Sequence, residues 1–364
     1  MKSMHEKYIN DALSIERKEI SSIPKIVGWE SPVNIALIKY WGKKEGQIPL
    51  NPSLSMTLSH AHTRTIIHYR RAAAKNGTIH FKFNAQSDHP FSKHVNTYLE
   101  KIKTYLPFLN DLDLYIESIN NFPHSAGIAS SASGMSALAL SVVSIEQKLR
   151  ETDLSDEIFF QKASYMARLG SGSASRSLYG GYVVWGDEDK GSADYAYPLP
   201  GKIHESFIHM HNSIFIVDSS SKVVSSSKGH ERMQDHPYKE ARIQQANKNF
   251  RSIKEALEDG NFERFAEITE EEAMSLHGLM LSSKKGYMLL NDTTLAIINK
   301  IREYRKKEKQ PVTFTLDAGP NVHILYPSSA KGYVRQFIDK ELIPLSPGSQ
   351  IIHDFTGKGP VKLH

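Results

Sequence analysis

The chain contains no cysteine among its 364 residues. Disulfide bonds and thiolate metal sites are therefore excluded, and an oxidising compartment gains no support. The longest apolar run, residues 135–145, is too short to cross a bilayer, and residues 1–22 lack the hydrophobic stretch of an export signal. We therefore expect a cytoplasmic protein without membrane association, in which residues 1–24 form an N-terminal extension.

Three motifs of common protein classes are also missing. The sequence has neither a Gly-x-x-x-x-Gly-Lys-Ser/Thr nucleotide loop nor a His-Glu-x-x-His zinc motif, and residues 170–175 lack the third glycine of a dinucleotide fingerprint. Basic residues do not alternate with aromatics along any one strand, so we expect no nucleic-acid partner. The net charge of +5 comes from 45 basic and 40 acidic residues and is compatible with an anionic substrate.

Length and periodicity predict an α+β chain of two domains, residues 25–200 and 201–364, joined through a segment rich in glycine, aspartate and proline. Alternating and apolar runs predict strands at residues 33–40, 53–58, 63–69, 78–83, 114–119, 181–185 and 213–218. Helical periods predict helices at residues 92–105, 133–149, 156–169, 232–257, 262–276 and 293–307.

Small residues and hydroxyls are concentrated in residues 121–134, NFPHSAGIASSASG, where an apolar helix begins. Residues without bulky side chains let backbone N–H groups and the positive end of a helix dipole approach a phosphate. The alternative is an N-capped helix that the chain enters through a glycine turn.

Three other segments carry charges at positions suited to chemistry. Residues 31–44, SPVNIALIKYWGKK, form an apolar strand that ends in aromatics and lysines, and residues 170–181, GSGSASRSLYGG, place Arg176 among small residues. The planar guanidinium of arginine can hold two oxygens of a carboxylate or phosphate at once. Residues 313–326, TFTLDAGPNVHILY, place Asp317 at the turn between two strands.

These four segments, in this order, resemble those of the diphosphomevalonate decarboxylase family. That family belongs to the small-molecule kinase superfamily of galactokinase, homoserine kinase and mevalonate kinase. The resemblance implies the two-domain GHMP-type fold: a ribosomal-protein-like N-terminal β/α domain that binds ATP, and a C-terminal α/β domain with an antiparallel sheet that supplies the catalytic aspartate. It also implies ATP-dependent conversion of (R)-5-diphosphomevalonate to isopentenyl diphosphate, CO2, ADP and phosphate, for isoprenoid biosynthesis.

The resemblance implies three catalytic residues. Asp317 would meet the C3 hydroxyl of the substrate, Lys39 would pair with Asp317, and Arg176 would hold the substrate carboxylate. Without the resemblance, Asp317 could cap a turn with its own backbone, Lys39 could be a charged strand end, and Arg176 could lie on the surface.

Further binding residues follow from the same resemblance. The residues expected to bind the substrate are Tyr40, Lys43, Ser173, Arg176 and Ser226, with Lys44 as a helper. The residues expected to hold the ATP phosphates are Ser125, Gly127, Ser130 and Ser131. Mg2+ would arrive with ATP, with Ser131 as the one candidate side-chain contact, since no cluster of metal ligands is evident in the sequence. We also expect a homodimer.

One departure from the family pattern concerns the phosphate end of the substrate. Many relatives place an arginine in an Asn-Gly-Arg turn, where this chain has Asn-Ala-Gln at residues 84–86, and Arg64, Arg70 or Lys82 would have to substitute. A phosphomevalonate decarboxylase and a mevalonate 3-kinase therefore stay open as alternatives. A non-catalytic anion- or RNA-binding protein is a further alternative, because the first domain's architecture also occurs in such proteins.

Overall fold

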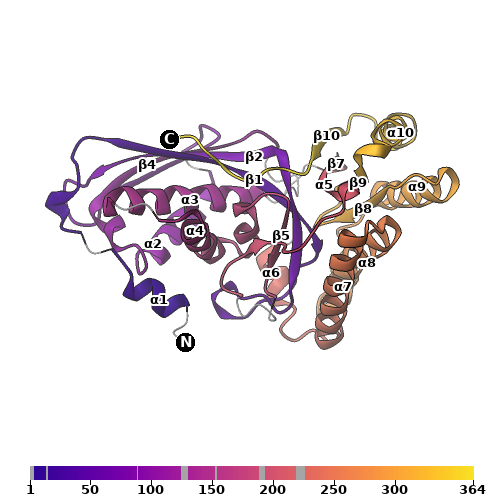
Figure 1. Ribbon diagram of the computed structural model, residues 1–364, viewed down its shortest axis with the longest axis horizontal. Coiled ribbons are helices and arrows are strands. Elements are labelled where there is room, and N and C mark those ends of the chain that lie inside the picture. The colour runs from indigo at the N-terminus through magenta and orange to yellow at the C-terminus, as the bar shows by residue number, and fades with distance from the viewer. Residues whose placement is uncertain are drawn as a thin grey trace.

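The computed structural model describes residues 4–13, 15–87, 89–123, 130–151, 154–187, 193–218 and 226–364. Two β-sheets lie side by side, each with helices packed on it (Figure 1). The first has the order β11-β1-β2-β4-β3, with β5 paired to β2 and β6 to β5, and the second has the order β10-β7-β9-β8. None of the described helices combines the length and the apolar character needed to span a bilayer.

The first sheet is built around two long antiparallel strands. Its strands are β1 (Lys25–Ile38), β2 (Ser53–Arg71), β3 (Ile79–Phe83), β4 (Leu112–Asn120), β5 (Tyr182–Trp185), β6 (Tyr197–Pro198) and β11 (Val361–Lys362). Alternate residues of β2 from Ala61 to Tyr69 are buried, as expected of a strand with one face on a core. Register shifts in β1 follow Pro32 and Ala36, close to where the strand approaches the second sheet.

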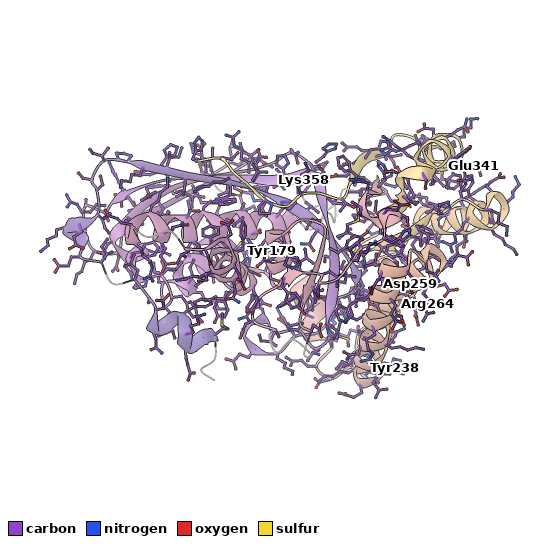
Figure 2. All side chains as sticks on the ribbon, viewed as in Figure 1. Tyr179, Tyr238, Asp259, Arg264, Glu341 and Lys358 are labelled. Carbon is purple, nitrogen blue, oxygen red and sulfur yellow. The ribbon has the colours of Figure 1, made fainter. Side chains whose placement is uncertain are left out.

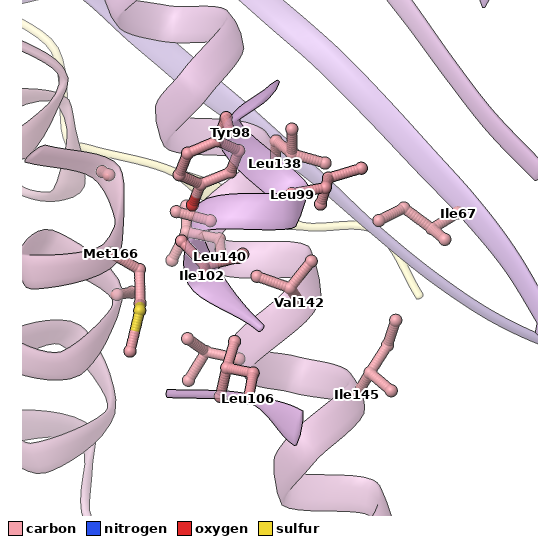
Figure 3. Packing of buried hydrophobic residues seen from close by; sticks show 14 of the residues in the cluster. Ile67, Tyr98, Leu99, Ile102, Leu106, Leu138, Leu140, Val142, Ile145 and Met166 are labelled. Carbon is pink, nitrogen blue, oxygen red and sulfur yellow. The ribbon is translucent and has the colours of Figure 1, made fainter. Parts of the chain in front are cut away.

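Helices cover one face of this sheet (Figure 1). They are α1 (Met4–Asn10), α2 (Phe91–Ile102), α3 (Ser130–Arg150), α4 (Asp156–Gly170) and the 3-10 helix η4 (Gly172–Leu178). Figure 3 shows Leu138, Leu140 and Val142 of α3 packed among side chains of α2 and the sheet. The apolar run of residues 135–145 is thus a buried core helix, as the sequence predicts.

The second sheet is antiparallel throughout. Its strands are β7 (Met210–Ile216), β8 (Thr313–Leu316), β9 (Val322–Pro327) and β10 (Gln350–Phe355). The helices of this half are α5 (Glu205–Ile208), α6 (Ser226–Glu231), α7 (Lys239–Asp259), α8 (Phe262–Ser282), α9 (Asp292–Glu308) and α10 (Lys331–Phe337). Asn261 and Asn291 cap α8 and α9 by accepting backbone N–H bonds with their side chains.

One apolar core joins the two sheets. It contains Val33 and Leu37 of β1 together with Phe250 of α7 and Phe265 of α8. At the other end of the chain, residues 356–364 cross back to the first sheet, where β11 pairs with β1. A Cβ atom on Gly180 would lie 2.3 Å from the carbonyl carbon of Lys358, so this crossing requires glycine. Lys358, labelled in Figure 2, belongs to the crossing segment.

Some element boundaries differ from the sequence prediction. The predicted strands at residues 53–58 and 63–69 are one strand, β2, because β1 pairs with both parts of it. The intervening N–H groups of Ser59, His60 and Ala61 donate to the Asp354 carboxylate. The predicted helix at residues 232–257 begins only at Lys239, after Pro237, which disfavours helix in the residue before it. Within the expected N-terminal extension, α1 is a mostly exposed helix whose Tyr8 packs into the core of the first half.

Candidate active site

The centre of the candidate site is an ion pair between the two halves. Lys39 follows β1, and its Nζ lies 3.0 Å from Oδ1 of Asp317, which follows β8. The same Nζ donates to the Ala36 carbonyl at 2.6 Å. Lys39 is 2% exposed. Burial lowers the pKa of Lys39, and the Asp317 carboxylate opposes this effect.

Arg176 lies close to this pair. It belongs to η4 and is buried, and its Nε and Nη1 donate to the hydroxyls of Ser55 (2.5 Å) and Ser53 (2.9 Å) of β2. Burial lowers the pKa of Arg176 to about 10, and the Asp317 carboxylate acts against this shift. The guanidinium and the carboxylate are therefore within electrostatic reach of one another, and these serines leave the Nη2 edge of the guanidinium unengaged.

The small residues of η4 allow close packing against Tyr40. A Cβ on Gly172 would lie 2.9 Å from the Tyr40 hydroxyl, so only glycine fits there. This hydroxyl is buried and has no hydrogen-bond partner among the described residues. Ser173 is half-buried, and its backbone carbonyl accepts from Nδ2 of Asn34, which fixes the loop against β1. A buried hydroxyl without a partner beside a tight loop fits a ligand-contacting group.

His230 of α6 is a site residue that the sequence reasoning missed. Its ring lies 4.3 Å from that of Tyr40 and 4.7 Å from that of Trp41, and its Nδ1 accepts the Gly42 N–H at 2.9 Å. The neutral ring therefore carries its proton on Nε2. Burial, with Lys43 and Arg176 nearby, lowers the pKa of His230 to about 3. Its partners are about 190 residues away in sequence, so no local pattern marks it.

Charges of both signs lie near Lys43. Its Nζ donates to Gln47 at 2.7 Å, and its pKa is lowered by burial, raised by the Glu231 carboxylate of α6 and lowered by the charge of Lys101 on α2. Burial lowers the pKa of Lys101, and Arg168 of α4 adds to this shift. Lys44, the expected helper, is exposed. Lys101 and Arg168 were not predicted as site residues.

The proposed substitutes for the missing arginine lie on strands β2 and β3 of the first sheet. Arg70 pairs with Asp113, and it is fifteen residues along β2 from Ser55, which contacts Arg176. At about 3.3 Å per residue in a strand, Arg70 is roughly 50 Å from Ser55, and Arg64 is roughly 30 Å from Ser55. Lys82 lies on β3, at the far edge of the first sheet from β1 and two residues before Asn84, where the turn itself begins. Arg64 and Arg70 are therefore far from Arg176, and the replacement of the arginine by one of the three residues stays a prediction.

The start of α3 is the expected nucleotide-binding segment. Ser130 and Ser131 lie in its first turn, where Ser130 is half-buried and Ser131 is exposed. The backbone N–H groups of a first helical turn lack partners within the helix and can bind an anion. Ser125 and Gly127 lie outside the described residues, as does the side chain of Ser226. Within the described residues, no group of three or more His, Cys, Asp or Glu side chains could hold a metal ion.

The two-sheet α+β architecture is that of the GHMP-type small-molecule kinases. Residues 31–196 match the diphosphomevalonate decarboxylase-like N-terminal domain, and residues 213–359 match the mevalonate 5-diphosphate decarboxylase C-terminal domain. The chain therefore belongs to the diphosphomevalonate decarboxylase family.

Individual relatives agree with this assignment. The chain is 34% identical to the diphosphomevalonate decarboxylase of Ganoderma lucidum and 31% identical to that of Saccharomyces cerevisiae. These alignments cover 85% of this chain, and 79% and 80% of the relatives. The mevalonate diphosphate decarboxylase structure from Staphylococcus aureus is similar with a TM-score of 0.80 at 30% identity, over 94% of this chain and 99% of that one. A structure of MDDEF in complex with MVAPP, AMPPCP and magnesium has a TM-score of 0.79 at 27% identity, over 94% and 100%.

Proposed function

We propose that the chain catalyses the ATP-dependent decarboxylation of (R)-5-diphosphomevalonate to isopentenyl diphosphate, CO2, ADP and phosphate. The observation that carries this proposal is the ion pair between buried Lys39 and half-buried Asp317, beside Arg176. The chemistry requires such a site, because loss of CO2 leaves an electron pair on C2 and no neighbouring carbonyl accepts it. ATP supplies the phosphoryl group that turns the C3 hydroxyl into a good leaving group.

Asp317 orients the C3 hydroxyl and accepts its proton during phosphoryl transfer. The Lys39 ammonium at 3.0 Å keeps Asp317 ionised and holds the carboxylate in one orientation. Asp317 is thus better suited to positioning the hydroxyl than to acting as a strong base.

Arg176 binds the substrate carboxylate through the edge of its guanidinium that Ser53 and Ser55 do not engage. Its two serine contacts fix the plane of the guanidinium. The C1–C2 bond is thereby held so that its electrons can enter the C2–C3 bond as the C3 oxygen leaves. The hydroxyl of Ser173 on the same loop contacts the substrate.

Tyr40, Lys43 and the helper Lys44 bind the diphosphate, together with Ser226 at the start of α6. The unpartnered Tyr40 hydroxyl and the positive charges of Lys43 and Lys101 support binding of the phosphate end of the substrate here. The diphosphate is the proposed substrate because the chain belongs to the diphosphomevalonate decarboxylase family. ATP phosphates lie at the segment Ser125, Gly127, Ser130 and Ser131, and Mg2+ binds with them, with Ser131 as its candidate protein contact.

The test is a substrate panel. The purified protein is incubated with MgATP and mevalonate, its 5-phosphate or its 5-diphosphate, while ADP and CO2 are measured. The expected result is release of both products with the diphosphate. CO2 from the monophosphate alone would favour a phosphomevalonate decarboxylase, and ADP without CO2 from mevalonate would favour a 3-kinase. RNA binding without any turnover would favour the non-catalytic alternative.

We also propose the division into residues 1–24, 25–200 and 201–364. The separate family matches support it, although residues 361–362 add a strand to the first sheet. The cytoplasmic location, the homodimer and the absence of a nucleic-acid partner stay predictions from the sequence.

A further inference from the structure

A second buried ion pair lies next to Lys39. Arg242 of α7 and Glu272 of α8 are 2% and 0% exposed, and their charged groups form two hydrogen bonds of 2.5 and 2.7 Å. Desolvation of two buried charges costs much of the free energy that their attraction provides, so a buried ion pair is weak evidence for a role in stability alone. The other contacts of Arg242 and Glu272 therefore indicate what the pair does.

Those contacts reach both backbone polar groups of Lys39. Oε2 of Glu272 accepts the Lys39 N–H at 2.8 Å, and Nη2 of Arg242 donates to the Lys39 carbonyl at 3.2 Å. Nδ2 of Asn51 donates to the same carbonyl at 3.0 Å. The backbone of Lys39 is thus held from the second half of the molecule, while its ammonium contacts Asp317, also from that half.

Helix α8 contacts both members of the Lys39–Asp317 pair. Glu272 binds the Lys39 N–H, and five residues later Nε2 of His277 lies 3.1 Å from the Asp317 carbonyl. Five residues of α-helix span about 7.5 Å along a stiff axis. The helix therefore sets the spacing between the two backbones that carry the reacting pair.

We propose that Glu272 and Arg242 are positioning residues for phosphoryl transfer, which hold the Lys39 backbone so that its ammonium meets Asp317. This inference rests on the proposed function. The charge of Glu272 also favours protonated Lys39. The charged and titratable groups that act on Lys39 are Asp317 of the β8–β9 turn, Glu272 and Arg242 of the helices, Arg176 of η4 and His323 of β9.

The test compares Glu272→Gln with the wild type and with Glu146→Gln. Glu146 is an apt control, because it is also fully buried and pairs with Lys162 and Arg150, but on α3 and away from Lys39. In Glu272→Gln we expect kcat to fall about 10- to 100-fold with KM within about threefold. The alkaline limb of its pH profile should move to lower pH, because Lys39 loses its proton more easily without this carboxylate. Glu146→Gln should keep the wild-type profile.

The outcomes separate the two proposals. A wild-type enzyme without CO2 release contradicts the proposed function itself. An active wild type together with an unshifted profile and an unchanged kcat in Glu272→Gln overturns the positioning role. If Glu272→Gln does not fold, Glu272→Asp tests the positioning role in its place. It keeps the charge but moves it by one methylene, so a lower kcat with the alkaline limb in place supports the role, and a wild-type kcat overturns it.

Discussion

At the residue scale, the site depends on charges that are buried together. Lys39 is 2% exposed, so burial lowers its pKa, and the carboxylates of Asp317 and Glu272 oppose this shift. The sequence predicts the pairing of Lys39 with Asp317 through motif resemblance. It does not predict Glu272, Arg242 or His230, because hydrogen bonds between residues about 190 to 230 positions apart leave no local pattern.

Replacing Lys39 tests the ion pair. Lys39→Gln keeps a polar side chain but removes the charge that orients Asp317, so kcat should fall about 100-fold or more, in the range typical of a lost acid–base or orienting group. Nucleotide affinity, measured by equilibrium binding of ATP, should stay within about threefold of wild type. A variant with more than a tenth of the wild-type kcat would show that the pair is dispensable.

Arg176 offers a second test at this scale. Arg176→Lys keeps a positive charge but cannot bind both serines and a substrate carboxylate in one plane. Loss of one charge-assisted hydrogen bond predicts an about 10- to 150-fold lower kcat/KM, at about 1.5–3 kcal/mol per bond. Steady-state kinetics with varied diphosphomevalonate measure this loss. An unchanged kcat/KM would contradict carboxylate binding by Arg176.

At the element scale, the second sheet carries three histidines with low pKa values. Burial lowers the pKa of His211, His323 and His353 to about 4 each, and the Nδ1 of His323 accepts from Asn212 at 3.0 Å. Between about pH 4 and 6.5 the unfolded chain binds protons that the folded chain does not. The contribution of these histidines to the free energy of unfolding should therefore be complete above pH 6.5. It should decrease as the pH falls through this window.

His323→Asn tests that prediction, because the asparagine oxygen can accept the same hydrogen bond but does not titrate. A pKa of about 4 against 6.5 corresponds to about 3 kcal/mol for the fully buried His323. Urea unfolding at pH 7 and pH 4.5 should show a smaller acid-dependent loss in the variant, by roughly 1–3 kcal/mol. The exposed His68 of β2, changed to asparagine, is the control. Equal losses in the wild type and His323→Asn would contradict the account.

The secondary structure was predictable from sequence where periodicity was strong. Helix α3 and the amphipathic α8 and α9 agree with their patterns. The fusion of two predicted strands into β2 was not predictable from the local pattern, because the residues between them bind Asp354, nearly 300 residues away. Pro237 was the available signal that α7 begins at Lys239 and not at residue 232, where the predicted helix begins.

At the scale of the whole molecule, the two halves are joined by more than the Lys39–Asp317 ion pair. Asp354 of β10 is 1% exposed and accepts the N–H groups of Ser59, His60 and Ala61 of β2 at 2.7–2.9 Å. Asp354→Ala leaves three N–H groups without this acceptor. We expect the free energy of unfolding to fall by about 2–4 kcal/mol, measured by urea denaturation.

The same change should loosen the site that lies between the halves, so kcat should fall while the nucleotide affinity changes little. Asp354→Asn, which keeps one carbonyl acceptor, should lie between Asp354→Ala and the wild type. A wild-type stability for Asp354→Ala would show that this contact does not join the sheets.

The central claim is that Asp317 enables phosphoryl transfer to the substrate, and that decarboxylation follows from it. The most direct measurement is the stoichiometry of CO2 and ADP released from MgATP and diphosphomevalonate by the wild type and by Asp317→Asn. We predict equal amounts of the two products from the wild type and a loss of both, about 100- to 10,000-fold in rate, from the variant. ADP release without CO2 by the wild type, or undiminished CO2 release by Asp317→Asn, would contradict the account.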